Sequence, residues 1–513
     1  MPKLHDAFGT TKRPAAMLHI CGLTLMFCGV GLVGSAAVEI LTGTTSDWQE
    51  LGGVGLVCLV IGSAVWGFTV VPKRIPVLDV FASVTGAWCT MICIGALPYY
   101  FTGTITDVDQ ALFESVSGFT TTGATVLQAS ETNPTLFAAS DGVLFWRSMT
   151  QWLGGMGVVV LVIAVLPSVG GWGMGLLQAE APGPTGERLT PRIRSTARRL
   201  WATYLLATAI VTIGYLIAGM GPHDAVSHAL TTVSTGGFSR YTLSMAHFNS
   251  ALIEWIAIGS MFTVGISFTL LYRLLLGKVG PLLHSIEFRL YVAVVAGATG
   301  VVYATAGAEH QTWTGFRNAL FTVTSLVSTT GYGTVDFANE WEDGAQVALL
   351  VLMPLGAMAG STAGGVKLIR LLIVASYAHR ETLRQLHPGL VRPIRLGRSV
   401  VDNRVANQVV GFLILALAAF GGGAMLIAMT GADLVTAFSA AATTIGNVGP
   451  GLADVGPRSD FTTITPFARL VSIALMILGR LEIYPILLAL AKFKIPVRRT
   501  TRRFRMSRTI SGS

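Results

Sequence analysis

The chain has 513 residues, of which 52% are hydrophobic and only 12% are charged, and its formal net charge is +9. Soluble globular domains carry about 25% charged residues, so this composition excludes an ordinary water-soluble domain. Stretches of 25, 27, 32 and 28 residues without Asp, Glu, Lys or Arg lie at 14–38, 80–106, 148–179 and 405–432. Because a helix needs about 20 apolar residues to cross a bilayer, the sequence predicts an all-α polytopic membrane protein.

Ten long apolar spans are predicted, in chain order, at 15–40, 51–72, 77–103, 143–177, 200–220, 250–276, 286–307, 345–377, 405–430 and 464–491. The first is too long for a signal peptide and is followed directly by a second span, so we expect it to be retained. The five cysteines lie inside apolar runs of the first hundred residues without metal-ligand company. Packing roles are favoured for them over disulfides or a metal site.

Basic and acidic clusters alternate along the chain. The basic ones lie at 12–13, 73–74, 188–199, 273–289, 370–404 and 492–508, and the acidic ones at 107–114, 131–141, 336–343 and 454–460. Lys and Arg concentrate in cytoplasmic loops, which predicts cytoplasmic termini. The acidic clusters would then face outward, where they would raise the local cation concentration. The basic tail follows a span, which favours a lipid-facing or partner-docking role over nucleic-acid binding.

Short segments lie between alternate spans, at Asp109–Thr122, Asp224–Thr235, Gly315–Thr330 and Asp433–Ile445. Their length predicts re-entrant helices, three of them capped by the Asp at their start. Each ends in a similar turn: "FTTTGAT", "TVSTGGF", "VSTTGYG" and "ATTIGNV", aligned on Gly123, Gly236, Gly331 and Gly446 at intervals of 113, 95 and 115 residues. This recurrence indicates an internal repeat of span, short helix, glycine turn and span, preceded by two further spans.

The chemistry of these turns suits a dehydrated monovalent cation. Backbone carbonyls replace hydration without a full negative charge, and glycine accepts the dihedrals that this requires. Thr and Ser hydroxyls add further oxygen atoms, and the C-terminal ends of the short helices would direct partial negative charge at the ion. The candidate ligands are Thr121, Thr122, Gly123, Ser234, Thr235, Gly236, Thr329, Thr330, Gly331, Thr444, Ile445, Gly446 and Asn447.

These motifs resemble the Trk/Ktr/HKT superfamily of potassium transporters, most closely its TrkH-type bacterial subunits. The resemblance covers nearly the whole chain, and its most specific stretches are "SGFTTTGATVL" (117–127), "QWLGGMGVVVL" (151–161), "TTVSTGGFS" (231–239), "GSTAGGVKLIRL" (360–371) and "NVGPGL" (447–452). It implies a pseudo-fourfold pore in one polypeptide of the bacterial inner membrane, with one selectivity glycine per repeat. Glycine at all four positions favours potassium over sodium.

The resemblance also implies an organisation and partners. We expect a two-helix segment at 1–75 and pore repeats at 76–178, 179–278, 279–398 and 399–513, the last including the basic tail. A homodimer and a cytoplasmic nucleotide-binding regulatory ring of the RCK or TrkA type are expected. The sequence contains no Rossmann or P-loop motif, so we expect no cofactor on the chain itself, with K⁺ as the transported ion.

Two gating elements are implied in the same way. The eighth span is interrupted by "PLGAMAGSTAGGVK" (354–367), which weakens a helix and in the family forms an intramembrane loop below the filter. Its candidate gate residues are Gly356, Gly360, Ser361, Thr362, Gly364 and Gly365. The alternative is a GxxxG packing face on a helix. Arg480 lies within the last span, where a charge is costly; a barrier facing the pore is favoured over a pair with Glu482.

Three other functions are compatible with a polytopic chain. The first is a weakly selective or sodium-coupled translocator of the same fold. The second is an intramembrane enzyme, which would need a catalytic constellation inside the spans, whereas the histidines lie singly or at span ends. The third is a sensor without conduction. Potassium uptake is favoured over all three, and no enzymatic activity is expected.

Overall fold

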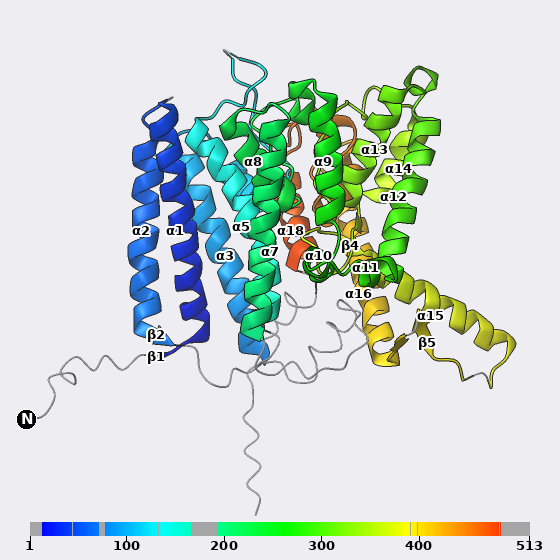
Figure 1. The fold of residues 1–513 in the computed structure, drawn as a ribbon. Helices are drawn as coiled ribbons and strands as arrows, with labels where there is room; N and C mark the ends of the chain where they lie inside the picture. The colour runs from blue at the N-terminus through cyan, green and yellow to red at the C-terminus, as the bar shows by residue number, and fades with distance from the viewer. Residues whose placement is uncertain are drawn as a thin grey trace, which may run out of the picture.

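The computed structural model describes residues 13–483 apart from 44, 71–76, 132, 166–192, 390, 398 and 482. In this part of the chain the protein is a bundle of helices, and its few strands form three two-stranded sheets. The predicted basic tail, Lys73 and Arg74, the end of the fourth span and Glu482 lie outside the described residues. Figure 1 shows the long helices running side by side, with the short helices α8 and α13 in the upper half of the bundle.

The predicted repeats group the described helices in chain order. Two helices, α1 (Ala16–Thr42) and α2 (Trp48–Phe68), come first. Repeat 1 contains α3 (Val77–Phe101), α4 (Val108–Phe119) and α5 (Asp141–Val165), and repeat 2 contains α7 (Ile193–Ile217), α8 (Pro222–Val233), α9 (Ala251–Val264) and α10 (Phe268–Leu275). Repeat 3 contains α12 (Ile286–Thr305), α13 (Trp313–Val327), α14 (Asp343–Leu352) and α15 (Leu368–Leu386). Repeat 4 contains α16 (Asn403–Ala428), α17 (Leu434–Gly446) and α18 (Pro466–Leu481). The four short helices α4, α8, α13 and α17 confirm the predicted re-entrant segments as helices.

Small elements complete the described fold. They are α11 (Gly280–Leu283) and the 3₁₀ helices η2 (Ser244–Phe248), η3 (Ala308–His310) and η4 (Ala453–Val455). Strands β1 (Arg13–Pro14) and β2 (Thr69–Val70) are parallel, as are β3 (Leu355–Gly356) and β4 (Val366–Lys367). The antiparallel pair β5 (Ile394–Leu396) and β6 (Ser399–Val401) packs beside the outer part of α15, beyond the lower end of the bundle in Figure 1.

Fewer helices than predicted are long, continuous and apolar. Among the described residues six meet these criteria: α1, α2, α3 from Phe81, α7 from Thr196, α12 and α16. The predicted span 250–276 is not one helix, because α9 and α10 meet at a bend of 108° and make a seventh span only if they are taken together. The eighth predicted span is interrupted between α14 and α15, as the glycine-rich segment indicated.

Close helix packing at the N-terminus depends on glycine. A Cβ on Gly29 would lie 2.8 Å from the carbonyl oxygen of Gly55, and one on Gly62 would lie 2.7 Å from that of Gly22. Such glycines let helix backbones approach each other in a membrane, where the hydrophobic effect adds little. The buried carboxylate of Glu39 then joins α1 to α5, because it accepts the N–H of Gly142 at 2.6 Å.

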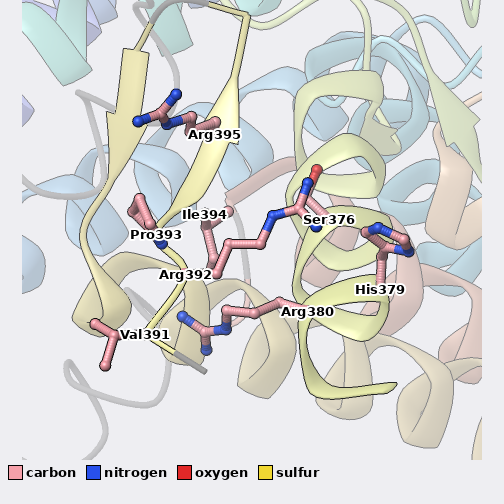
Figure 2. Close-up of a pocket in the computed structure, with 8 residues that line it drawn as sticks. All are labelled: Ser376, His379, Arg380, Val391, Arg392, Pro393, Ile394 and Arg395. Carbon is pink, nitrogen blue, oxygen red and sulfur yellow. The ribbon is translucent and has the colours of Figure 1, made fainter. Parts of the chain in front are cut away.

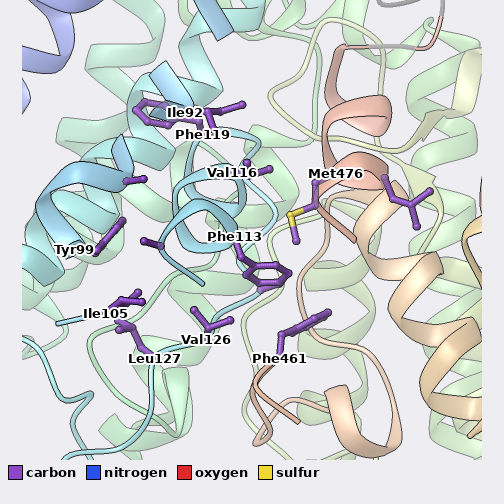
Figure 3. Packing of buried hydrophobic residues seen from close by; sticks show 14 of the residues in the cluster. Ile92, Tyr99, Ile105, Phe113, Val116, Phe119, Val126, Leu127, Phe461 and Met476 are labelled. Carbon is purple, nitrogen blue, oxygen red and sulfur yellow. The ribbon is translucent and has the colours of Figure 1, made fainter. Parts of the chain in front are cut away.

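The short helices are held inside the bundle by apolar side chains from neighbouring repeats. Figure 3 shows Phe113, Val116 and Phe119 of α4 packed among residues of α3 and α18, including Met476, and against Phe461. A second cluster joins repeat 3 to the turn after α17, and a third brings Phe321 and Tyr332 into repeat 2. These clusters cross three seams between repeats, so the core fixes the repeats relative to one another.

Candidate functional site

The four turns that follow the short helices share one backbone conformation. Each has a non-glycine residue at positive φ and, two positions later, a glycine at positive φ: Thr121 (53°) and Gly123 (83°), Thr235 (57°) and Gly237 (77°), Thr329 (57°) and Gly331 (80°), Asn447 (54°) and Gly449 (108°). Left-handed backbone at a non-glycine residue is uncommon and strained, and clusters at functional sites. Its recurrence four times indicates a built site. We call residues 120–124, 234–238, 328–332 and 446–450 glycine turns 1 to 4.

The same hydrogen bond closes each turn. The residue between the two positive-φ positions donates its N–H to a carbonyl five residues earlier: Thr122 to Ser117 at 2.9 Å, Gly236 to Thr231 at 2.8 Å, Thr330 to Ser325 at 2.8 Å and Val448 to Thr443 at 2.9 Å. These bonds define the equivalent residues in the four repeats without reference to sequence similarity.

The resulting register corrects the sequence alignment in two repeats. Gly123 and Gly331 are equivalent, as aligned, but their counterparts are Gly237 and Gly449 instead of Gly236 and Gly446. Gly446 is the last residue of α17. The candidate ligands Thr444 and Ile445 also belong to α17, so they precede the turn. The remaining candidate ligands lie in the turns, and the quoted "NVGPGL" stretch already contained the correct glycine of turn 4.

The four turns close into a ring. A Cβ on each of the four positive-φ glycines would collide with a carbonyl oxygen of the next repeat: Gly123 with that of Gly236, Gly237 with Thr330, Gly331 with Val448 and Gly449 with Thr122. The four acceptors are the equivalent residues defined above, so the contacts run from repeat 1 through 2, 3 and 4 and back to 1. Glycine is required at these positions because both the φ angle and the neighbouring backbone exclude a side chain.

Side chains behind the ring fix the turns in place. In turns 1, 3 and 4 a hydroxyl of the preceding helix donates to the carbonyl after the glycine: Ser117 to Ala124, Ser325 to Tyr332 and Thr443 to Pro450. Turn 2 is held by Gln151, whose amide donates to the carbonyl of Gly236 at 2.7 Å and accepts the N–H of Phe238 at 3.0 Å. Ring geometry is therefore set by contacts outside the ring.

Tyr332, which makes turn 3 look most like a potassium-channel filter, reaches sideways into repeat 2. Its buried hydroxyl lies 2.5 Å from the hydroxyl of Thr231 and donates to the carbonyl of His228 at 3.0 Å. Tyr332 therefore links repeat 3 to repeat 2 through side-chain hydrogen bonds.

Ion pairs bridge each seam between neighbouring repeats. Arg240 of repeat 2 bonds Asp141 of repeat 1, Arg317 of repeat 3 bonds Glu254 of repeat 2 at 2.5 Å, Arg458 of repeat 4 bonds Glu340 of repeat 3 at 3.2 Å, and Arg469 of repeat 4 bonds Asp109 of repeat 1 at 2.8 Å. Several carboxylates predicted to attract cations are thus engaged by arginines.

Two of the expected helix caps are also replaced by ion pairs. Asp109 and Asp224 lie in the first turns of α4 and α8, after the N-cap residues, and bond Arg469 and Arg240. Only the third expected cap has the predicted role, since Asp433 accepts the N–H of Thr436 at 2.6 Å. Arg240 also lies beside Tyr241, whose pKa is raised to about 12 by burial and by its hydrogen bond to Asp224.

Turn 1 rests on a buried ion pair that sequence reasoning missed. Glu114 of α4 bonds Arg147 of α5 at 2.7 Å, and both side chains are almost fully buried. Glu114 also accepts the N–H of Val126, and Arg147 donates to the carbonyl of Ser239 at 3.0 Å. The pair therefore ties the segments after turns 1 and 2 together.

Replacing Arg147 with methionine should lower stability sharply. Removing one partner of a buried ion pair leaves an uncompensated charge and costs about 3–5 kcal/mol. We expect a lower thermal unfolding temperature in detergent, and partial recovery in the double variant Arg147→Met with Glu114→Gln, which removes the orphaned charge. A single variant as stable as the double variant would contradict this account.

The 353–367 loop lies against the deep end of the ring, where the short helices end. Thr362 donates its hydroxyl to the carbonyl of Val233 at 3.1 Å, and Gly364 donates its N–H to the hydroxyl of Thr329 at 2.7 Å. Gly364 also has no room for a Cβ because Asn447 and Gly446 adjoin it. The loop thus touches repeats 2, 3 and 4 at once.

The backbone of the loop excludes a helical packing face. Its ends pair as parallel strands, Leu355 with Val366 and Gly356 with Lys367. A Cβ on Gly356 would collide with the carbonyl of Gly364, and Gly360 and Gly365 have φ angles of 75° and 63°. The GxxxG alternative is therefore wrong for this segment. Ser361 is buried and donates to the carbonyl of Met358 at 2.6 Å.

Arg480 joins the last helix to this loop. Its Nη1 donates to the carbonyl of Thr362 at 2.7 Å, whereas its Nε and Nη2 have no hydrogen-bond partner among the described residues. The side chain is 5% exposed. A positive charge therefore lies directly behind the loop segment that faces the ring.

A separate pocket lies between α15 and the β5–β6 hairpin. Its lining residues are Ser376, His379, Arg380, Val391, Arg392, Pro393, Ile394 and Arg395. Figure 2 shows Arg380 of α15 and Arg392 of the segment before β5 reaching into the space between the two elements. Arg380 is engaged by Glu381 at 2.8 Å and by Asn403 at 2.5 Å, whereas Arg392 and Arg395 are exposed.

The bundle and the ring of carbonyl-bearing turns define a polytopic membrane protein of the ion-transporting class. The family model for TrkH, described as a cation transport protein, matches residues 55–290 and 308–497. The chain belongs to the TrkH family of cation transport proteins, and this membership answers the question of an intramembrane enzyme in favour of a transport protein.

Relatives and a solved structure agree with this assignment. The Trk system potassium uptake protein TrkH of Escherichia coli K12 is 36% identical over 489 residues, which cover 92% of this chain and 97% of that protein. The protein of the same name from Halomonas elongata is 32% identical over 482 residues and is covered to 97%. The crystal structure of the potassium transporter TrkH from Vibrio parahaemolyticus matches with a TM-score of 0.82 at 32% identity, over 93% of this chain and 98% of that one.

Proposed function

We propose that this chain mediates potassium uptake through a single-chain pseudo-fourfold pore lined by glycine turns 1 to 4. The observation that carries the proposal is the closed ring of glycine–carbonyl contacts between successive repeats. Such a ring presents backbone oxygens to a dehydrated cation and keeps them in place by packing. The relatives are named as potassium uptake proteins, which suggests potassium as the transported ion. Glycine at all four corrected positions supports potassium over sodium.

The proposed architecture is a two-helix segment at 1–75 followed by pore repeats at 76–178, 179–278, 279–398 and 399–513. The membrane would be the inner membrane of a bacterium, with both termini in the cytoplasm. Inward flux would be driven by the membrane potential, which contributes about 2.3 kcal/mol per charge per 100 mV. The chain would carry no cofactor of its own.

Within this pore the 353–367 loop would act as the gate. Its contacts with Val233, Thr329 and Arg480 support this role, because they hold the loop across the deep end of the ring. Gly356, Gly360, Gly364 and Gly365 would permit the tight course of the loop, and Ser361 and Thr362 would face the ion path when the loop moves. The Arg480 guanidinium would repel cations until then.

The decisive experiment is rubidium uptake into proteoliposomes that contain the purified chain, with potassium and sodium as competitors. Potassium uptake predicts strong competition by potassium and weak competition by sodium. Equal competition would favour the weakly selective or sodium-coupled alternative, and the absence of any flux would contradict conduction. Anomalous scattering from rubidium in crystals would show independently whether ions occupy the ring.

We also propose a homodimer that is regulated by a cytoplasmic nucleotide-binding ring. The support on the chain is the basic pocket between α15 and the hairpin, because α15 begins directly where the gate loop ends. A partner with an acidic surface that bound there would act on the loop through one continuous helix. Complementary charge raises association rates and specificity.

Reversing charge at this pocket should weaken partner binding without affecting the pore. The double variant Arg392→Glu with Arg395→Glu is expected to bind the regulatory ring with lower affinity and with a weaker salt dependence, measured by pull-down over a salt series. Arg384→Glu is the matched control, since Arg384 is exposed on α15 outside the pocket. Equal loss of binding in both would contradict docking at the pocket.

A further inference from the structure

A buried carboxylate bonds the backbone of the gate loop. Glu287, in the first turn of α12, is 1% exposed, and its Oε1 accepts the N–H of Ala359 at 2.7 Å. Ala359 belongs to the 353–367 loop, just before the residues that touch the ring. A side chain of one helix therefore holds the backbone of the loop directly.

The position of Glu287 explains how a charged group is tolerated there. Burying a carboxylate is costly unless it is hydrogen-bonded, and bonds from N–H groups to a charged acceptor are stronger than neutral ones. The N-terminus of α12 adds favourable partial positive charge in its first turn.

The bend between α9 and α10 holds the same stretch of the loop from another side. Met358 donates its N–H to the carbonyl of Gly265 at 3.1 Å, and Phe268 donates to the carbonyl of Gly360 at 2.9 Å. Loop residues 358–360 are thus bound by two elements of the bundle, whereas the residues after them face the ring. The 108° break in the sixth predicted span is where the loop docks.

We infer that Glu287 is a positioning residue that clamps the gate loop in its closed place. The inference rests on the proposed function of the loop as a gate. Glu287 fixes Ala359, and through the short segment 360–364 it keeps Thr362 and Gly364 against the ring. Loss of the clamp releases the loop.

The test compares Glu287→Ala with Glu39→Ala in the full chain. Glu39 is a matched control because it is also a buried carboxylate that accepts backbone N–H groups, from Gly142 at 2.6 Å and Thr45 at 2.7 Å, but it lies on α1 and bonds no residue of the loop in the described contacts. Rubidium flux without any regulatory partner, normalised to folded protein, should rise about tenfold for Glu287→Ala. It should stay at the wild-type level for Glu39→Ala.

A second readout follows the loop itself. Ser361→Cys, in a chain whose five native cysteines are replaced, is buried and should react slowly with a water-soluble thiol reagent. Glu287→Ala should accelerate labelling, whereas Glu39→Ala should not. Glu287→Gln keeps an oxygen acceptor of the same reach, so it should restore most of the slow labelling and low flux.

The outcomes separate this inference from the proposed function. Fast labelling in Glu287→Ala, without fast labelling in Glu39→Ala, supports the clamp even if no chain conducts rubidium. The absence of rubidium conduction in every chain would contradict the uptake proposal and not the clamp. Labelling and flux equal to those of Glu39→Ala would overturn the clamp. If Glu287→Ala does not fold, Glu287→Asp decides against Glu39→Asp, because the shorter carboxylate no longer reaches the N–H of Ala359. Faster labelling in Glu287→Asp than in Glu39→Asp supports the clamp, and equal labelling in the two overturns it.

Discussion

Replacing Gly331 with serine should lower rubidium uptake at least about tenfold and reduce the preference for potassium, whereas Gly333→Ser should remain close to wild type. Gly331 has a φ of 80°, and a Cβ there would strike the carbonyl oxygen of Val448. Left-handed backbone at a non-glycine residue costs about 1–3 kcal/mol, enough to displace that carbonyl. Gly333 has space, since its nearest neighbour to a Cβ is Pro457 at 3.7 Å.

This pair is informative because both glycines belong to the same Thr-Thr-Gly-Tyr-Gly run. Uptake with sodium competition, normalised to folded protein, measures both variants under identical conditions. Unchanged potassium preference in Gly331→Ser, or equal damage from both variants, would count against the ring as the selectivity element.

The same logic tests the corrected register in repeat 2. A Cβ on Gly237 meets the backbone carbonyl of Thr330 at a φ of 77°, whereas one on Gly236 meets the side chain of Gln151. A side chain can move more easily than a backbone carbonyl. Gly237→Ala should therefore impair selectivity more than Gly236→Ala, and the reverse order would restore the original alignment.

Deleting residues 360–364 should raise the basal flux of the chain strongly. The deletion removes the hydrogen bonds of Thr362 to Val233 and Arg480 and that of Gly364 to Thr329, which together hold the loop at the ring. The paired ends at β3 and β4 lie outside the deleted residues. Flux without regulatory partner, divided by the amount of monodisperse protein, is the measurement.

A milder variant tests whether the flux of the deletion variant arises from lost loop contacts and not from a shortened loop. Thr362→Val keeps the length of the loop and removes one hydroxyl bond, so its flux should lie between the wild-type and deletion values. Basal flux that stays at the wild-type level in a folded deletion variant would show that the loop does not obstruct the path.

Much of the fold follows from the sequence because its signals are local. Runs of apolar residues locate the helices, and the glycine-rich segment after Pro354 breaks the eighth span as predicted. The break between α9 and α10 was missed, because residues 250–276 contain no charged residue apart from Glu254 and Arg273. Only tertiary contacts with the 353–367 loop show where the helix bends. A run of apolar residues predicts that a segment lies in the membrane, but it does not predict where a helix in that segment bends.

The site was predictable to the level of the turn but not of the residue. Adjacent glycines at 236 and 237, and two separate ones at 446 and 449, satisfy the sequence pattern equally well. The choice depends on which peptide N–H closes the turn, and that is a backbone property. Similarly, Asp109 has the identity of a helix cap, but Arg469, 360 residues away in sequence, bonds it instead.

Because one chain closes the ring, each of its four turns can be changed separately. In an assembly of four identical subunits, by contrast, a single substitution changes all four quarters of the ring at once. Here the codons for Gly123, Gly237, Gly331 and Gly449 are separate, and each can change alone. If the ring selects the ion as proposed, ion preference can change through one turn at a time while the other three turns stay intact.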